Sequence, residues 1–395
     1  MSTPIKTLSF DQIYNLCNEL AQPRYRADQL ISWLFVKQAN NYDEMSNLPK
    51  AFRATLAEDY PLVPACLIDR QVSSDGTRKY CFELADGARV EAVGIPSMQI
   101  NASGEPKSLT VCFSTQAGCS MQCLFCATGS EGFTRNLSSG EMIDQVAFIQ
   151  EDFGLRVSHV VSMGQGEPFL NYDATLQALD FLNSKKGFGI GARHITISTC
   201  GVISGIERLG NDPHQYTLAV SLHSAEQVVR DMLMPRCSAQ PLPELKTALC
   251  AYQAASGRRV SLEYLMIDGV NDTETALEAL IAFTRDLMCH VNLIPLNAVD
   301  HSRLKPSAQN AVSYTHLEDI FHLVFCAIQA DRIHLVLFVG EKDDIERLIQ
   351  FTQFKCKKRD LTLSTRRMIE LFEICHHITD RSNELLKRIL HSLRT

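Results

Sequence analysis

The sequence lacks the features that mark several large classes of protein. No apolar run approaches the ~18 residues that a membrane-spanning helix needs, so we expect no membrane partner. The N-terminal stretch mixes Lys6, Asp11 and Glu19 with its apolar residues and contains no signal-peptide core. Positive charge is not in excess either, because 38 Lys and Arg stand against 45 Asp and Glu, a net charge of −7. These absences predict a cytoplasmic protein that would contact nucleic acid only through a local basic patch.

What is present indicates a globular α/β fold. Hydrophobic residues make up 45% and charged residues 21% of the 395 residues, which excludes disordered, collagen-like and coiled-coil chains. From residue 109 onward, short apolar segments alternate with helical stretches such as 139–152 and 174–184. Such alternation predicts parallel βαβ units, and hence a partial (β/α) barrel with its chemistry at the carboxyl ends of the strands. The predicted strands are 109–115, 157–163, 194–199, 217–222, 260–267, 291–296 and 334–339.

The regions that flank this core have a different character. Residues 1–97 combine helical apolar spacing with a predicted hairpin at 79–95, and we interpret them as an N-terminal helical and hairpin accessory domain. The core domain is expected to span 98–345. Residues 346–395 form a C-terminal extension, and the last 45 residues carry ten Lys and Arg against five acids. This extension is the best local basic patch for contacting phosphates.

The 14 cysteines are not expected to form a disulfide framework, because the cytosol keeps thiols reduced. A single Cys in apolar surroundings is usually a small buried hydrophobic residue. We predict that role for nine of them: Cys17, Cys66, Cys81, Cys200, Cys237, Cys250, Cys289, Cys326 and Cys375.

Cys119, Cys123 and Cys126 are different, because three thiols within eight residues can surround one inorganic centre. Structural zinc is one interpretation, but zinc normally takes two separated ligand pairs, and Cys112 is the only nearby fourth candidate. The other interpretation is a [4Fe–4S] cluster on three thiolates, which leaves one iron open to an external ligand. The amino and carboxylate groups of S-adenosylmethionine can chelate that iron, an arrangement that supports radical chemistry.

A series of ordered motifs resembles the RlmN/Cfr family of adenine-C2/C8 RNA methyltransferases, within the radical S-adenosylmethionine (SAM) superfamily. The resemblance covers about 25–345, in order and at family spacing, and so many ordered matches do not arise by chance. The matching segments are 25–29, 42–45, 111–128, 132–137, 163–168, 196–199, 221–223, 263–264 and 292–297.

The resemblance implies a radical-SAM barrel that holds a [4Fe–4S] cluster on Cys119, Cys123 and Cys126. It also implies a SAM site in which the Gly166-Glu167 motif binds the methionine end and Asn297 contacts the adenosine. The contacts to the cofactor's carboxylate and ribose would come from Ser198, Ser221, Leu222 and His223.

Two further residues acquire chemical roles from the resemblance. Glu91 matches a proton acceptor, although a strand Glu is ordinarily solvent-facing. Cys112 matches a Cys that helps to resolve a covalent enzyme–RNA adduct, although its apolar strand equally fits a core residue. The implied partners are ribosomal or transfer RNA, not DNA, and an external electron donor.

The sequence departs from the family at one position. The family's methyl-carrying Cys follows an Asp-Asp-Ile segment, and here Ile349 stands in that place. The nearest thiol is Cys356, seven residues further on. Two alternatives therefore stay open beside RNA methylation: a radical-SAM enzyme with different chemistry, and a non-catalytic RNA-binding paralogue. The intact Cys triad opposes the second, because exposed thiolates without a cluster are prone to oxidation.

Overall fold

The computed structural model describes residues 3–63, 65–101, 103–297, 299 and 302–307, together with two strands at 323–325 and 336–337. The chain divides into two compact units. The first holds the described residues up to Leu222, Glu226–Val260 and those of 298–303, and the second holds His223–Ala225, Ser261–Asn297 and those from Leu304 onward. Ile349, Cys356 and the whole basic extension lie outside the described residues.

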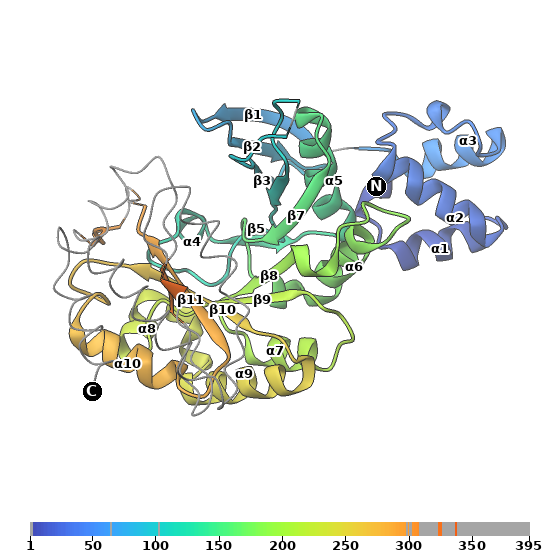
Figure 1. Cartoon of the computed structure of the whole chain (residues 1–395). Helices are drawn as coiled ribbons and strands as arrows, with labels where there is room; N and C mark the ends of the chain where they lie inside the picture. Colours follow the sequence, from blue (N-terminus) through green and yellow to red (C-terminus); the bar gives the residue numbers. More distant parts are fainter. Residues whose placement is uncertain are drawn as a thin grey trace, which may run out of the picture. The chain divides into compact units, whose positions relative to one another are not determined.

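The first unit begins with three helices, as the apolar spacing predicts: α1 (Phe10–Glu19), α2 (Arg24–Ile31) and α3 (Lys50–Asp59) (Figure 1). Helix α1 starts at a capping box, in which Ser9 and Gln12 satisfy each other's backbone N–H groups. These helices are tied to the core by a buried ion pair between Lys6 and Asp144, whose Nζ and Oδ1 atoms are 2.8 Å apart.

The sheet of the first unit has the strand order β1-β2-β3-β4-β7-β8-β9. Strands β4, β7, β8 and β9 are parallel, which confirms the predicted βαβ pattern. Strands β1 to β4 pair antiparallel, so the predicted hairpin continues the core's sheet through β3 and β4. The strand bounds are β1 Cys66–Val72, β2 Arg78–Glu83, β3 Arg89–Pro96, β4 Leu109–Cys112, β7 Val157–Ser162, β8 Ile195–Thr199 and β9 Thr217–Ser221.

Helix α5 (Ser139–Phe153) covers one face of this sheet and leaves the other for the site. A Cβ atom added to Gly94 on β3 would lie 2.7 Å from the Ile149 side chain and 2.5 Å from that of Phe153. The helices that follow are α6 (Tyr172–Asn183), α7 (Ile203–Gly210), α8 (Gln227–Leu233) and α9 (Leu242–Ser256).

A separate two-stranded sheet lies between β4 and α5. It consists of β5 (Gln116–Gly118) and β6 (Phe133–Asn136), which pair antiparallel and enclose α4 (Ala127–Glu131). The backbone N–H of Cys119 donates to the Gly132 carbonyl at 2.8 Å, and this hydrogen bond joins the two ends of the loop. The three clustered cysteines lie in this loop.

The second unit contains most of β10 (Val260–Met266), with α10 (Glu274–Thr284) and β11 (Cys289–Pro295). Strand β11 pairs antiparallel with β12 (Leu323–Phe325), which pairs antiparallel with β13 (Val336–Leu337). These two pairings depart from the parallel pattern that the sequence predicts. Within the described residues, no helix is long and apolar enough to span a membrane.

Candidate active site

The loop between β5 and β6 brings Cys119, Cys123 and Cys126 into one segment. Cys119 directly follows β5, and Cys126 is the residue that precedes the first turn of α4. A turn joins the last two, since the Cys126 N–H donates to the Cys123 carbonyl at 3.1 Å. The paired strands on either side fix both ends of the loop, so its backbone presents the three thiols together.

The burial of these thiols bears on what they can hold. Burial raises the pKa of Cys119 to about 11, against the opposing hydrogen bond from the Met121 N–H at 3.5 Å, and burial also raises the pKa of Cys123. Thiolates at such positions need a positive partner. The Cys119, Cys123 and Cys126 side chains interact electrostatically with one another, so the three lie close together. Thiolates of one short segment are the ligands that iron–sulfur clusters take in proteins, so the donor set fits a cluster.

A second loop, after β7, contacts the cysteine loop. The Glu167 N–H donates to Gln116 Oε1 at 2.9 Å, and the Gln116 N–H donates to the Gln165 carbonyl at 3.2 Å, three residues before Cys119. Gly166 has φ +104°, and a Cβ atom there would lie 2.6 Å from the Cβ of Gln116, so only glycine fits. The Gly166-Glu167 motif therefore lies directly beside the cysteine loop.

Glu167 is a buried carboxylate, 2% exposed. Its Oε1 accepts the Phe169 N–H at 2.9 Å and its Oε2 accepts the Cys200 N–H at 2.7 Å. Burial raises the pKa of Glu167, and these backbone hydrogen bonds oppose the shift. No Lys, Arg or His of the described chain forms an ion pair with it, and the nearby Gln165 Oε1 is buried without a hydrogen-bond partner. A carboxylate and an amide oxygen that can each accept further hydrogen bonds fit the ammonium group of a methionine moiety.

Glu91 and Cys112 lie on the same face of the sheet. Val93 and Cys112 are direct partners across β3 and β4, and Glu91 precedes Val93 by two residues on β3. Residues two apart on a strand point to the same side, so Glu91, Val93 and Cys112 share the face opposite Gly94 and α5. Burial raises the pKa of Cys112 to about 11, and an ion pair of 2.7 Å joins Glu91 Oε1 to Lys79 Nζ.

The strand pairing carries this face toward β9. Cys112 is opposite Val161 on β7, Val161 is opposite Thr196 on β8, and Ser198 follows two residues later. Ser198 is in turn opposite Ala219 on β9, so Ser221 also shares the face.

Leu222 has a different environment. Its side chain is fully buried, as are those of Leu218 and Val220, which point to the same side of the strand. Ala219 and Ser221 point to the opposite side. A cofactor contact by Leu222 would therefore use its backbone.

His223 and Asn297 belong to the second unit. His223 is buried with φ +54°, and its Nδ1 accepts the Leu265 N–H at 3.1 Å, which places its ring proton on Nε2. The Asn271 amide donates to the His223 carbonyl at 2.6 Å and so fixes this unusual backbone. Asn297 follows β11 and is exposed.

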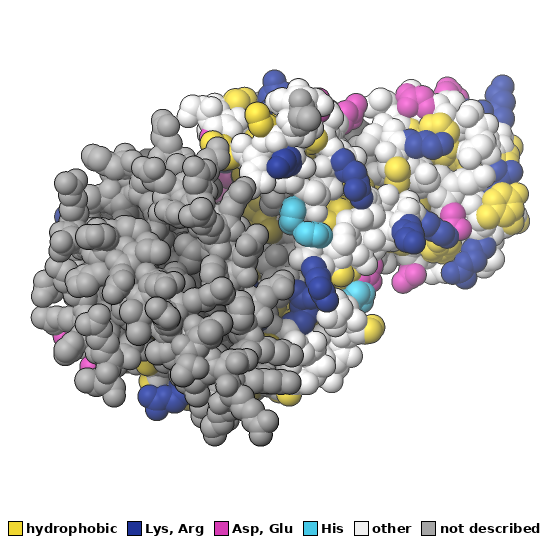
Figure 2. All heavy atoms as spheres, viewed as in Figure 1, with side chains coloured by type: hydrophobic (Ala, Val, Ile, Leu, Met, Phe, Trp, Pro, Cys, Tyr) yellow, Lys and Arg dark blue, Asp and Glu magenta, His cyan; other side chains and the backbone are white. Residues whose placement is uncertain are grey.

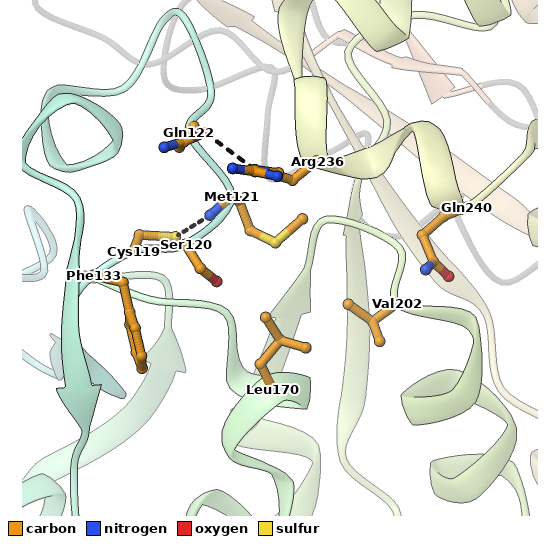
Figure 3. Close-up of a pocket in the computed structure, with 9 residues that line it drawn as sticks. All are labelled: Cys119, Ser120, Met121, Gln122, Phe133, Leu170, Val202, Arg236 and Gln240. Atoms are coloured by element: carbon orange, nitrogen blue, oxygen red, sulfur yellow. Dashed lines mark hydrogen bonds between the residues drawn. The ribbon is translucent and has the colours of Figure 1, made fainter.

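A cavity of about 480 Å³ opens at the cysteine loop, within the size range of small-molecule sites (Figure 3). The Arg236 Nε atom donates to Gln122 Oε1 at 3.1 Å across its rim, and the Met121 side chain points into the space. The lining residues are Cys119, Ser120, Met121, Gln122, Phe133, Leu170, Val202, Arg236 and Gln240.

Several residues of this region were not singled out from the sequence. Met121 and Gln165 lie inside the matched segments 111–128 and 163–168 but were given no role of their own. Arg236 lies outside every motif, and only the fold brings it to the cavity. Cys200 and Cys237 were predicted to be isolated buried residues; both are buried, but they are neighbours. The prediction for Cys66 is wrong, because it lies at the start of the edge strand β1 and is exposed. Cys326 and Cys375 lie outside the described residues.

The fold and the cysteine loop define a class of protein. The radical SAM superfamily matches residues 113–280, and the N-terminal domain of ribosomal RNA large subunit methyltransferases matches residues 5–61. A solved radical SAM methyltransferase from Sphaerobacter thermophilus is similar in structure, with a TM-score of 0.70 and 38% identity. The match covers 79% of this chain and 90% of that one.

Curated relatives narrow the class. A protein of Synechococcus elongatus is 44% identical over 76% of this chain and 81% of its own length, and one of Thermotoga neapolitana is 40% identical over 78% and 88%. A protein of Gloeobacter violaceus is 40% identical over 84% of this chain and 92% of its own length. All three are described as probable dual-specificity RNA methyltransferases RlmN. This chain belongs to the RlmN family of the radical SAM superfamily, which confirms the resemblance seen in its motifs.

Proposed function

We propose that this protein is a radical-SAM RNA methyltransferase that modifies an adenosine of ribosomal or transfer RNA. Cys119, Cys123 and Cys126 would hold a [4Fe–4S] cluster, and Gly166 and Glu167 would bind the methionine end of SAM. The observation that carries the proposal is the contact between these two loops, in which the Glu167 N–H donates to Gln116 Oε1 at 2.9 Å, three residues before Cys119. A cofactor held by the second loop would lie directly against a cluster held by the first.

When bound, the cluster and SAM supply the radical that starts the reaction, with the electron coming from an external donor. The chain's own residues bind and orient. The buried Glu167 carboxylate offers an anionic partner to the cofactor's ammonium group, and Ser198 and Ser221 offer hydroxyl groups on the shared face. The family resemblance assigns further contacts, to the ribose and the adenosine, to His223 and Asn297.

Two residues of the same face would act on the RNA. Glu91 would take a proton from the substrate carbon, and the ion pair with Lys79 at 2.7 Å would orient its carboxylate. The Cys112 thiol, diagonal to Glu91 across β3 and β4, would resolve a covalent adduct with the base. Burial raises the pKa of Cys112, so this thiol must lose its proton to a base before it acts as a nucleophile.

Mass spectrometry of RNA nucleosides from cells with and without the gene tests this function. We expect methyladenosine to disappear without it, to return with the wild-type gene, and not to return with Cys119→Ala. The exposed thiol variant Cys66→Ala is the matched control and should restore methylation. Nucleosides that are identical in both strains would contradict RNA methylation.

A second outcome separates methylation from other radical chemistry. Ile349 stands where the family has a methyl-carrying Cys, and its side chain cannot carry a methyl group. A radical reaction other than methylation therefore needs its own test. Purified protein with reductant, SAM and RNA should release 5′-deoxyadenosine together with methylated RNA. Release of 5′-deoxyadenosine without methylated RNA would assign the chain to another radical reaction.

A further inference from the structure

Two thiols lie together behind the cavity. Cys237, between α8 and α9, is fully buried, and its Sγ lies 3.6 Å from the carbonyl oxygen of Cys200, which follows β8. Each thiol also shifts the pKa of the other, as neighbouring side chains do. They come from segments 37 residues apart, so only the fold brings them together.

A buried arginine accompanies this pair. Arg230 on α8 is fully buried, and its Nη2 donates to the Cys200 carbonyl at 2.5 Å. Its Nε has no hydrogen-bond partner, and among the described residues no carboxylate forms an ion pair with its guanidinium group. A buried cation without a carboxylate is costly unless another anion faces it. The hydrogen bond with Cys200 and the charge of Arg230 both lower the pKa of the Cys237 thiol.

We propose that Cys200 and Cys237 form a peroxide-sensitive dithiol that, once oxidised to a disulfide, weakens cofactor binding at the neighbouring cavity. The cavity brings a small oxidant close, because Arg236 and Val202 line it and flank the two cysteines in sequence. The adjacent positive charge and the paired thiol are the surroundings in which a cysteine reacts with peroxide and is then resolved.

The chemistry balances in two steps. The Cys237 thiolate attacks hydrogen peroxide, which gives a sulfenic acid and hydroxide. The Cys200 thiol then displaces water from that sulfenic acid, and the S–S bond forms. The two sulfurs lose two electrons, which reduce one peroxide. A small dithiol such as dithiothreitol returns two electrons and two protons and restores both thiols.

The effect on the cofactor passes through Glu167. The Cys200 N–H donates to Glu167 Oε2 at 2.7 Å, so a bond that draws the Cys200 side chain toward Cys237 acts on that hydrogen bond. Hydrogen bonds to a buried charged group are strong enough that a disturbed one weakens SAM binding by about tenfold. The proposal concerns the SAM site alone and does not require that RNA be the substrate.

Peptide mapping of the iron-loaded protein after limited peroxide treatment tests the proposal. Trypsin separates residues 194–208, which contain Cys200, from 237–246, which contain Cys237, and both from the cluster cysteines in 108–135. We expect 194–208 linked to 237–246 in the wild type, no link in Cys200→Ser or Cys237→Ser, and an unchanged link in Cys17→Ser. Cys17 is a matched control because it is buried and lies on α1.

SAM affinity is then compared between the wild type and the double variant Cys200→Ser/Cys237→Ser at equal iron content. Peroxide should weaken binding about tenfold more in the wild type, and dithiothreitol should reverse the difference. Treated protein that lacks the linked peptides, or that has them and binds SAM as the double variant does, overturns the proposal. The wild-type mapping needs no variant to fold.

Discussion

At Gly166 the absence of one side chain decides the shape of the cofactor loop. Its backbone has φ +104°, and any Cβ atom would collide with Gln116. We expect Gly166→Ala to lower the free energy of unfolding by about 2 kcal/mol or more, because strain and collision act together. Gly87→Ala is the control: its φ is +81°, but nothing lies within 4 Å, so it should cost only about 1 kcal/mol. Denaturant unfolding measures the free energy of unfolding of both variants. Equal decreases would show that the structure around Gly166 shifts enough to remove the collision.

The cysteines give a second test at the residue scale. Anaerobically reconstituted protein should hold about four irons per chain. Each of the changes Cys119→Ala, Cys123→Ala and Cys126→Ala should abolish iron binding, because the loop offers no substitute ligand. Cys112→Ala should keep its iron, since that thiol lies on β4. Metal analysis measures the iron and zinc content of each variant. Stoichiometric zinc after anaerobic purification would show that the three cysteines bind zinc and not an iron–sulfur cluster.

At the scale of the elements, Arg135 on β6 connects the β5–β6 pair to the rest of the first unit. Its guanidinium donates to Asp86 at 2.6 and 3.0 Å and to Glu141 at 2.8 and 2.9 Å. Asp86 lies in the turn between β2 and β3, and Glu141 lies in the first turn of α5. One side chain thus joins the cysteine loop to the hairpin that carries Glu91 and to the helix behind the sheet.

This contact predicts a pH dependence. The hydrogen bonds from Arg135 lower the pKa of Asp86 to about 2, from an ordinary value of 3.8. A carboxyl with a lowered folded-state pKa stabilises the fold above about pH 4, and that contribution is lost as the pH falls toward 2. Because Asp86 is half exposed, we expect only about 1 kcal/mol. Unfolding of Asp86→Asn at pH 7 and pH 2 measures it: the variant should be less stable than the wild type at pH 7, and most of that deficit should disappear at pH 2. The same deficit at both values would contradict an ionic origin.

The elements also show what the sequence predicts well and what it does not. Helix α1 and strands β7, β8 and β9 follow from apolar periodicity, because their buried faces leave a regular pattern. Strand β1 was not predicted, since all but one of its residues are exposed and it has no buried face to read. The short strands of the cysteine loop were also missed, because three or four residues around glycines give no periodicity.

For the site, the spacing of Cys119, Cys123 and Cys126 already indicates a metal cluster, because its ligands are close in sequence. The neighbours Cys200 and Cys237 could not be paired from the sequence, because their proximity depends on how β8 and α8 pack. The sequence also could not predict that Gln165 Oε1 is buried without a hydrogen-bond partner, because burial depends on the fold and not on the residue type.

For the whole molecule, net charge governs how it meets RNA. The chain is acidic overall, and Figure 2 shows its Lys and Arg side chains interspersed with acidic and apolar ones on the visible described surface. Of the basic residues considered from the sequence, Lys186 pairs with Asp28 at 3.3 Å and Arg258 donates to Thr217 at 3.0 Å. Lys185 and Arg259 are exposed and remain the better phosphate contacts.

We therefore expect RNA affinity to depend on few contacts and to fall with salt. Lys185→Gln and Arg259→Gln should each lower the log–log salt slope by about 0.7 to 0.9, if each residue neutralises one phosphate. Deleting residues 357–395, which carry much of the basic extension, should lower it by several such steps and leave SAM cleavage intact. Filter binding from low to high salt measures the slopes. Unchanged slopes in the deletion would remove the extension from the interface.

The separation of the β5–β6 pair from the main sheet bears on how the enzyme matures. For the cysteine loop to swing open, the two short strands and the Arg135 contacts must release, together with two hydrogen bonds of the loop. These join the Leu124 N–H to the Leu233 carbonyl at 2.9 Å and Arg236 Nε to Gln122 Oε1 at 3.1 Å. Glu167 meanwhile stays fixed in the core by the Cys200 N–H. Local openings of so small a unit require far less free energy than unfolding. Amide hydrogen exchange should accordingly be faster in β5 and β6 than in β7 and β8 before iron is supplied. An assembly protein could then deliver iron and sulfide to a finished barrel, so that folding and metallation are separate events in the life of the chain.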